Sequence, residues 1–223
     1  MNRCKLADRS LPDYTRAEEN FNFISHAVGG ALAVAALVLC VVRSAMHSDP
    51  WACSASSVYG VSLILLYAVS SVYHGLRPPM AKKIMQVLDH CTIYFLIGGS
   101  YTPVALCALR RVSPAWGWTI FGAVWGFCAI ACIFTAIDLH KYSRLAMLCY
   151  VGMGWCIVIA FKPFLAAVEL PGVMLLIAGG VAYTIGAVLY GIGKKKRWMH
   201  SVFHLFVIAG SVLQFFSIYF YVI

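Results

Sequence analysis

The sequence predicts an all-α membrane protein, a bundle of seven transmembrane helices. Of its 223 residues, 62% are hydrophobic and only 11% are charged, whereas a soluble domain carries about 25% charged residues. The apolar residues gather in long unbroken runs, which are typical of membrane helices rather than of the alternating strands of a membrane barrel. The chain lacks the polar side chains that would cover a water-soluble surface.

A membrane-spanning helix needs about 20 apolar residues. Seven runs of this kind follow one another along the chain: Phe21–Val42, Ala52–Leu76, Ile84–Leu109, Trp116–Ile137, Leu145–Phe161, Val173–Ile192 and Trp198–Ile223. Short connections with turn-forming pairs such as Asp49-Pro50 and Pro78-Pro79 separate them, so no second domain is expected. Residues 1–20 form a short polar tail without the pattern of a secretory signal peptide, so residues 21–223 are predicted to be one transmembrane domain.

The distribution of lysine and arginine predicts the orientation. The N-terminal tail and the second, fourth and sixth connections hold 13 of the 17 basic residues, and the remaining connections hold 4. The positive-inside rule therefore places the N-terminus inside and the C-terminus outside, in a multi-pass protein of the cell inner (plasma) membrane. The net charge of +9 follows from this topology and from attraction to anionic lipid, so no nucleic-acid partner is expected.

Cysteine and glycine carry two further structural expectations. Among the nine cysteines, three lie near the outer side and are candidates for a disulfide: Cys40, Cys53 and Cys107. The glycine pairs at positions 29, 98 and 179, and the segment from Gly122 to Gly126, are predicted to be sites of close helix packing.

The ionisable residues within the apolar runs gather at one depth. His74 lies two residues before the inner end of the second run, and Asp89 lies five residues into the third. His200 and His204 lie two and six residues into the seventh run. At 1.5 Å per residue, all four lie within about 10 Å of the predicted cytoplasmic boundary. Ionisable residues inside a membrane are costly, so this layer is a candidate functional site.

These residue types point to zinc. His200 and His204 are four residues apart and share one helix face, where both imidazoles can meet one cation. With His74 they form a predicted three-histidine zinc site, which leaves the fourth position for water, as in catalytic sites. Asp89 is predicted to hold and deprotonate that water or to be an additional ligand. Ser70 lies one turn deeper than His74 on the same face. It is predicted to form a hydrogen bond with one of the metal-ligating side chains or to stabilise an oxyanion.

Each of these residues also has a purely structural interpretation. The three histidines can pack without a metal, Asp89 can pair with Lys82 or Lys83, and the Ser70 hydroxyl can bond its own backbone. The remaining histidines in or near the runs are predicted to be interfacial anchors: His26, His47 and His90.

Four motifs occur in a fixed order along the chain. They are Glu18-Glu19-x-x-Asn22-x-x-Ser25-His26-x-x-Gly29, then Ser70-Ser71-Val72-Tyr73-His74, then Leu88-Asp89-His90-Cys91-Thr92-Ile93-Tyr94 with Gly99-Ser100-Tyr101-Thr102-Pro103, and His200-x-x-x-His204. Together they resemble the hemolysin III branch of the progestin and adipoQ receptor family, from about residue 18 to the end. The resemblance implies a seven-helix bundle with an inside N-terminus and a zinc ion held at His74, His200 and His204. It also implies that Asp89 and Ser70 lie beside the metal.

The resemblance suggests several functions, because receptor members are thought to hydrolyse ceramide whereas bacterial members are named for haemolysis and linked to membrane homeostasis. The first is a zinc-dependent hydrolase of a lipid amide or ester, with a membrane lipid as substrate. The second is a sensor or homeostasis protein with structural zinc. The third, a pore or transporter, would need polar groups at several depths or helices broken near the midplane. The fourth to sixth runs show neither, so the pore ranks last. The sequence does not distinguish a monomer from a dimer.

Overall fold

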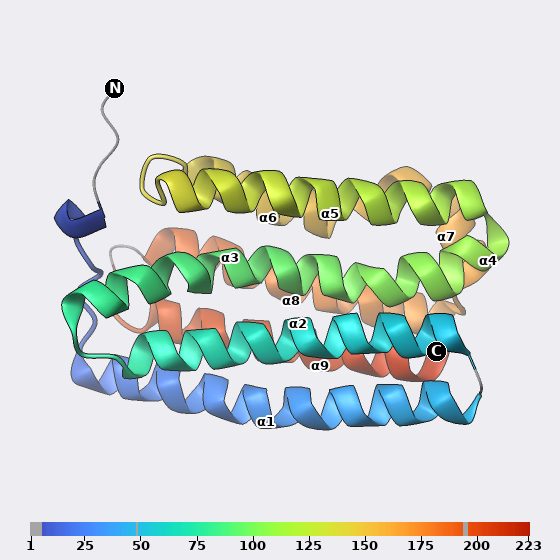
Figure 1. The fold of residues 1–223 in the computed structure, drawn as a ribbon, viewed down its shortest axis with the longest axis horizontal. Coiled ribbons are helices and arrows are strands. Elements are labelled where there is room, and N and C mark those ends of the chain that lie inside the picture. The colour runs from blue at the N-terminus through green and yellow to red at the C-terminus, as the bar shows by residue number, and fades with distance from the viewer. Residues whose placement is uncertain (1–5, 48, 194–195) are drawn as a thin grey trace.

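The computed structural model describes residues 6–47, 49–193 and 196–223. All regular structure within these ranges is helical, and seven helical segments are long and apolar enough to cross a membrane. The seven segments lie side by side along one axis (Figure 1). Because their number is odd, Arg16 at the start of the first and Tyr221 at the end of the last lie at opposite ends of the bundle. The predicted fold class is confirmed.

Each predicted run corresponds to one span. The spans are α1 (Arg16–Met46), α2 (Pro50–Gly75), α3 (Pro79–Pro103), α5 (Pro114–Ile137), α6 (Ser143–Gly154) with α7 (Phe161–Ala167), α8 (Leu170–Gly193) and α9 (Met199–Tyr221). Most helices begin a few residues before their apolar run, in a first turn that is polar or contains proline. In α1, for example, the Thr15 hydroxyl accepts the backbone N–H of Glu18, whose carboxylate accepts the backbone N–H of Thr15, and this capping box starts the helix.

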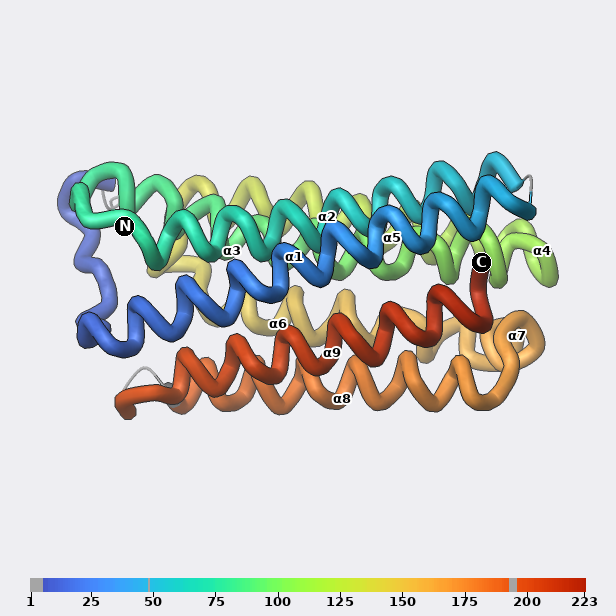
Figure 2. Tube along the Cα trace, turned by 90° about the horizontal axis from the view of Figure 1, so that it is seen from below, coloured from blue at the N-terminus to red at the C-terminus, as the bar shows by residue number. Residues whose placement is uncertain are grey.

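The spans form a closed ring. Consecutive spans pack side by side, and α9 returns to lie against α1, as the tube view shows (Figure 2). Below, the end where α1 and α9 begin is called the inner end, because its basic residues predict that it is cytoplasmic, and the opposite end is called the outer end. Closure of the ring brings the inner ends of α1, α2 and α9 together, and this is where the candidate site lies.

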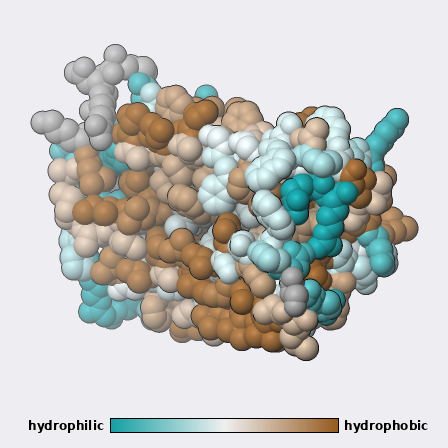
Figure 3. Space-filling view, turned by 45° about the vertical axis from the view of Figure 1, so that its right-hand side comes forward, coloured by the Kyte–Doolittle hydropathy of each residue, from teal (hydrophilic) through white to brown (hydrophobic). Residues whose placement is uncertain are grey.

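The side of the bundle is apolar. Figure 3 shows broad hydrophobic areas along it and hydrophilic side chains toward its ends. Large exposed hydrophobic side chains occur on many spans, including Ile24, Val38, Phe127, Leu148 and Val188. A surface of this kind is unfavourable in water and is suited to contact with lipid tails.

Two spans depart from a regular α-helix. The third passes after Pro103 through a π-helical turn, η2 (Val104–Leu109), into the short α4 (Arg110–Val112). The fifth is interrupted between α6 and α7 by Trp155 and a 3₁₀ turn, η3 (Cys156–Ala160). The Tyr101 hydroxyl donates to the Gly154 carbonyl at 2.8 Å and accepts the Ile157 N–H at 3.1 Å, so it satisfies backbone groups that the break leaves without helical partners. The expectation that the fourth to sixth runs contain no broken helix is therefore wrong.

The glycines divide into two groups. A methyl group added at Gly99 would lie 2.6 Å from the Cβ atom of Ser62 on α2, so only glycine permits this close approach of α2 and α3. In contrast, a methyl group at Gly122 or Gly126 on α5 would meet no atom within 4 Å. The predicted packing role is confirmed at Gly99 and is wrong within this chain for the Gly122 to Gly126 segment.

Polar contacts hold the outer end without a disulfide. Arg111 forms an ion pair with Asp49, and the Arg43 Nε atom donates to the Ile223 carbonyl at 3.0 Å. The cysteines that were candidates for pairing are free thiols in the structure: Cys40, Cys53 and Cys107. These contacts engage two of the four basic residues of the outer side.

The glycine contrast predicts the outcome of one pair of substitutions. Gly99→Ala should lower the free energy of unfolding by about 1–3 kcal/mol, because it overpacks the α2–α3 contact. Gly122→Ala should be neutral or slightly stabilising, because the added methyl group meets open space and alanine favours helix. Thermal unfolding of both purified variants in one detergent checks this, and equal melting temperatures would contradict the packing assignment.

The contacts of Asp49 predict a pH effect. Its Oδ1 atom accepts the backbone N–H groups of Trp51 and Ala52 at 2.9 and 3.1 Å and so caps α2. Burial raises the pKa of Asp49, but these bonds and the Arg111 charge outweigh burial and lower it below its ordinary value. The stabilisation is therefore present above the ordinary pKa of an aspartate and is lost as the pH falls through the lowered value. At neutral pH, Asp49→Ala should cost about 1 kcal/mol and Asp49→Asn less, since asparagine also caps helices; chemical denaturation at several pH values measures both.

Candidate metal centre

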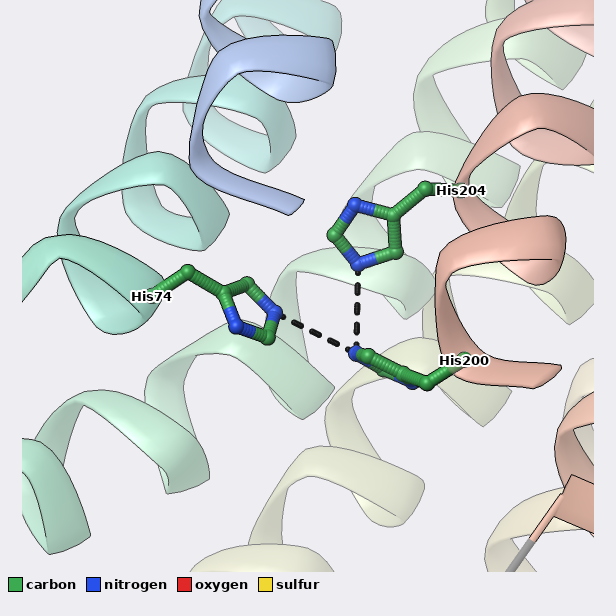
Figure 4. A group of neighbouring side chains, drawn as sticks. All are labelled: His74, His200 and His204. Carbon is green, nitrogen blue, oxygen red and sulfur yellow. Dashed lines mark hydrogen bonds between the residues drawn. The ribbon is translucent and has the colours of Figure 1, made fainter. Parts of the chain in front are cut away.

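Three buried histidines converge at the inner end of the bundle. His74 comes from the last turn of α2, and His200 and His204 come from the first two turns of α9. The Nε2 atom of His200 lies 3.2 Å from the Nε2 atom of His74 and 3.2 Å from that of His204 (Figure 4). One ring nitrogen of each residue lies within 4.8 Å of the other two, so the group can hold a metal ion.

Hydrogen-bonding partners at Nδ1, the ring nitrogen that faces away from the cluster, fix the tautomers of His74 and His204. The Nδ1 atom of His74 lies 2.6 Å from the Glu19 carboxylate, which only accepts, so we assign the proton of His74 to Nδ1. The Ser25 hydroxyl donates to the Asn22 carbonyl and lies 3.4 Å from the Nδ1 atom of His204, so its oxygen is left to accept from that nitrogen. Both neutral imidazoles therefore direct an Nε2 lone pair at His200.

A bound metal cation explains the spacing of the three Nε2 atoms better than hydrogen bonds between the imidazoles do. The Nε2 atom of His200 can donate one N–H, to His74 or to His204, so at least one 3.2 Å contact between nitrogens has facing lone pairs. A tetrahedral metal with nitrogen ligands at about 2.0–2.1 Å places its ligand atoms roughly 3.3 Å apart, close to the two observed separations. The donor set and two of its three separations thus fit a metal ion that accepts all three lone pairs, and the third pair of nitrogens lies within 4.8 Å.

Two adjacent carboxylates at the start of α1 position the histidines. Glu18 accepts the backbone N–H of Trp198 at 2.6 Å, and Trp198, with a φ of 65°, is the residue just before α9. Glu19 contacts His74 through one oxygen and the Lys82 ammonium at 2.7 Å through the other. Each helix that carries a ligand is therefore tied to the first turn of α1 by a charge-assisted hydrogen bond.

His26 is a site residue that sequence reasoning missed. Its ring is buried and stacks on His204 with 3.6 Å between ring centroids, so the prediction that it is an interfacial anchor is wrong. Both of its ring nitrogens are buried without a hydrogen-bond partner among the described residues, as are both amide atoms of Asn22 and the Ser201 hydroxyl. The signal was present in the sequence, because Asn22 and His26 are four residues apart and share one face of α1.

An internal cavity of about 110 Å³ adjoins the histidines. His200, His204, Ser70 and Asp89 all line it, so the structure brings both predicted catalytic residues to one space beside the metal ligands. The rest of the wall is mainly apolar and includes Leu66, Ile93, Leu96, Ile97, Phe203 and Val207. Asp89 is outside the group of converging ligand atoms, which favours a role beside the metal over one as a ligand.

The competing interpretation of Asp89 as a lysine partner is not supported by the described contacts. Lys82 pairs with Glu19, and Lys83 donates to the Ala7 carbonyl. The basic side chain nearest to Asp89 among these contacts is His90, with 3.9 Å from its Nδ1 atom to a carboxylate oxygen of Asp89.

His90 and His47, the other two histidines predicted to be interfacial anchors, lie in different environments. His90 also lines the cavity, and its Nε2 atom lies 3.0 Å from the Tyr190 hydroxyl, so the prediction that it is a simple anchor is wrong. His47 is exposed at the outer end and suits the anchor role.

A wider cavity of about 600 Å³ opens at the inner end. It shares His200 and Tyr190 with the internal cavity and contains the basic side chains of Arg144 and Arg197. Tyr14 forms part of its wall and stacks on His200, with 5.0 Å between ring centroids and 16° between ring planes. Burial raises the pKa of Tyr14, so its phenol stays protonated at neutral pH. The histidine cluster thus lies between a polar vestibule, lined by both acidic and basic side chains, and a mainly apolar internal cavity.

Comparison with known proteins adds the family. The family model described as "Haemolysin-III related" matches residues 14–215. The chain belongs to the haemolysin III-related family. The match includes every residue of the site above, and the resemblance predicted from the four motifs is confirmed. Family and spans together make the chain a multi-pass membrane protein.

Individual relatives of this haemolysin III-related chain extend from bacteria to mammals. "Hemolysin-3" of Bacillus cereus is 37% identical over 92% of both chains. "Hemolysin-3 homolog" of Bacillus subtilis is 34% identical over 93% of this chain and 96% of the relative. The human "Monocyte to macrophage differentiation factor" is 26% identical over 92% of this chain and 84% of the relative.

The hydrogen bond from His74 to Glu19 predicts a graded loss of metal binding. Glu19→Ala should weaken metal binding about 10- to 100-fold, because it removes the partner that orients His74. Glu19→Gln should lose less, because an acceptor remains. The exposed Glu169→Gln at the outer end should bind like the wild type. Titration of chelator-stripped protein with divalent metals, followed by elemental analysis, gives these affinities.

The double variant His200→Ala/His204→Ala provides the reference without a site and should retain no metal. A wild-type protein that is metal-free after purification without chelator would contradict the assignment of this cluster as a metal centre.

Proposed function

We propose that this protein is a zinc-dependent hydrolase of lipid amides or esters that works at the cytoplasmic side of the inner (plasma) membrane and contributes to membrane homeostasis. The observation that carries the proposal is the position of the histidine cluster at the junction of a polar vestibule and an apolar cavity. A lipid has the matching construction, because a hydrolysable linkage joins its polar head to its hydrocarbon chain.

The donor set supports zinc as the metal. Three imidazoles, two of them with a hydrogen-bonding partner at Nδ1, are a common ligand set of catalytic zinc, and they leave one position free. When bound, zinc would supply Lewis acidity and a water molecule of lowered pKa. His74, His200 and His204 would hold it, with Glu19 and Ser25 as their hydrogen-bonding partners.

The chain's own residues would then divide the remaining work. Asp89, on the cavity wall, would accept the proton of the attacking water and return it to the leaving amine or alcohol. The Ser70 hydroxyl, also on that wall, would donate to the oxygen on which negative charge develops. The apolar walls would hold the acyl chain and exclude bulk water.

The size of the cavity favours one hydrocarbon chain. A buried water needs about 10–15 Å³ of such space, so the 110 Å³ of the cavity would hold roughly seven to eleven water molecules. A mainly apolar space of this size suits the acyl group of a single amide or ester linkage.

A sensor with structural zinc is the second candidate. It is favoured by the fact that the three ligands come from α2 and α9 and so would fix two spans together. In this alternative, Asp89→Asn would alter stability or signalling and no lipid would be turned over. A pore is disfavoured, because the walls of the internal cavity are mainly apolar and offer few partners to a hydrated ion.

The proposal predicts that Asp89→Asn retains zinc and loses turnover. We expect fatty acid release from a panel of amide- and ester-linked lipids in proteoliposomes to fall about 10²- to 10⁴-fold, the usual contribution of a general base. Glu169→Gln should hydrolyse at the wild-type rate. If zinc-loaded wild type releases no fatty acid from any lipid of the panel, the hydrolase proposal fails and the sensor remains.

A further inference from the structure

The far end of the internal cavity carries a polar group deep in the membrane. Gln214 lines the cavity wall fourteen residues beyond His200 on α9, which corresponds to about 21 Å along the helix. It also lines a smaller cavity of about 60 Å³, which extends to Phe164 and Leu176 near the outer end. The residues that line both spaces are Ser100, Tyr101, Gly154, Trp155, Gly180 and Gln214. Gln214 therefore lies at the junction of the two spaces.

The amide of Gln214 has unmet hydrogen-bonding capacity. Its Oε1 atom is buried and has no partner among the described residues. The neighbouring donors are already engaged: Trp155 Nε1 donates to Thr184 at 3.0 Å and Tyr101 donates to the Gly154 carbonyl. A buried amide oxygen without a donor is unfavourable, and contact with a methylene group does not relieve it.

Packing on α8 holds this amide in place. A methyl group added at Gly179 would lie 2.7 Å from the Cγ atom of Gln214 and 3.1 Å from the Gly210 carbonyl. Glycine at position 179 thus provides the space that the stem of Gln214 fills. The side chain is confined between α8 and the cavity, so the position of its polar end is set by the fold.

We propose that Gln214 sets the maximum length of the acyl chain that the internal cavity accepts. This inference rests on the proposed function, in which an acyl chain occupies the cavity. Each methylene group buried against the apolar wall up to Gln214 strengthens binding of the chain. A methylene group that covers the Gln214 amide weakens binding. With about 1.3 Å of length per carbon in an extended chain, from carbon–carbon bonds of about 1.5 Å, a path of about 21 Å holds roughly sixteen carbons.

Without the Gln214 amide, an apolar chain should be able to extend from the internal cavity into the smaller cavity. Gln214→Leu presents methyl groups in place of the amide, so a longer chain can continue into the smaller space toward Phe164 and Leu176. Each methylene newly buried there should strengthen binding about fourfold. Gln214→Met, an unbranched apolar side chain, provides a second variant if the leucine variant folds poorly.

The test is a binding series that requires no turnover. Purified, metal-loaded protein is incubated with radiolabelled palmitic acid, which is displaced by saturated fatty acids from decanoic to docosanoic acid. Wild type should bind best near palmitic acid and weakly at docosanoic acid. The Gln214 variants should bind docosanoic acid at least about tenfold more tightly than wild type does. The control Phe220→Leu, on an exposed position of the same helix, should keep the wild-type profile.

The outcomes separate this inference from the proposed function. An identical length profile in wild type and both Gln214 variants overturns the length limit, even if lipids are hydrolysed. Failure of fatty acids of every length to bind also overturns it. A shifted profile in a protein that hydrolyses no lipid supports the length limit and removes the hydrolase proposal.

Discussion

The candidate site depends on two neighbouring carboxylates in the first turn of α1. Glu18 fixes the start of α9 through the backbone of Trp198, and Glu19 fixes His74 at the end of α2. In a bilayer, lipid tails are as apolar as the helix faces, so packing alone gives weak control over how far one helix slides along another. Charge-assisted hydrogen bonds at the inner end supply that control, and they set the level at which the imidazoles meet.

The polar network of this layer is only partly complete within the chain. His74 and His204 each have a partner for Nδ1, whereas the Nδ1 atom of His200 and both nitrogens of His26 have none among the described residues. Buried polar atoms are usually satisfied. His26 and His200 both line the internal cavity, so in the proposed function their unpartnered nitrogens are available to a group from outside the chain.

The broken fifth span contributes to this cavity. Gly154 and Trp155, where α6 ends, line the cavity wall, and Tyr101 satisfies the backbone on both sides of the break. Irregular backbone at membrane depth is tolerated where it is buried or lines a cavity. The Gly99-Ser100-Tyr101-Thr102-Pro103 motif thereby gains a physical reason: Gly99 admits α2, Tyr101 supports the break, and the Thr102 hydroxyl accepts the Trp125 indole N–H at 3.1 Å.

The sequence by itself determined the spans and the level of the site. Apolar runs need no tertiary information, because each helix satisfies its own backbone in lipid, and the common depth of His74, His200 and His204 follows from counting residues along rigid helices. Only the tertiary structure decided which side chains meet. Closure of the ring placed α1 beside α9, so His26 became part of the site, while Gly122 and Gly126 faced outward instead of toward a neighbouring span. The break at Trp155 was also invisible in the sequence, since its stabilising partner Tyr101 lies on another span. Depth is a one-dimensional property of a helix, whereas the direction a side chain faces depends on its neighbours.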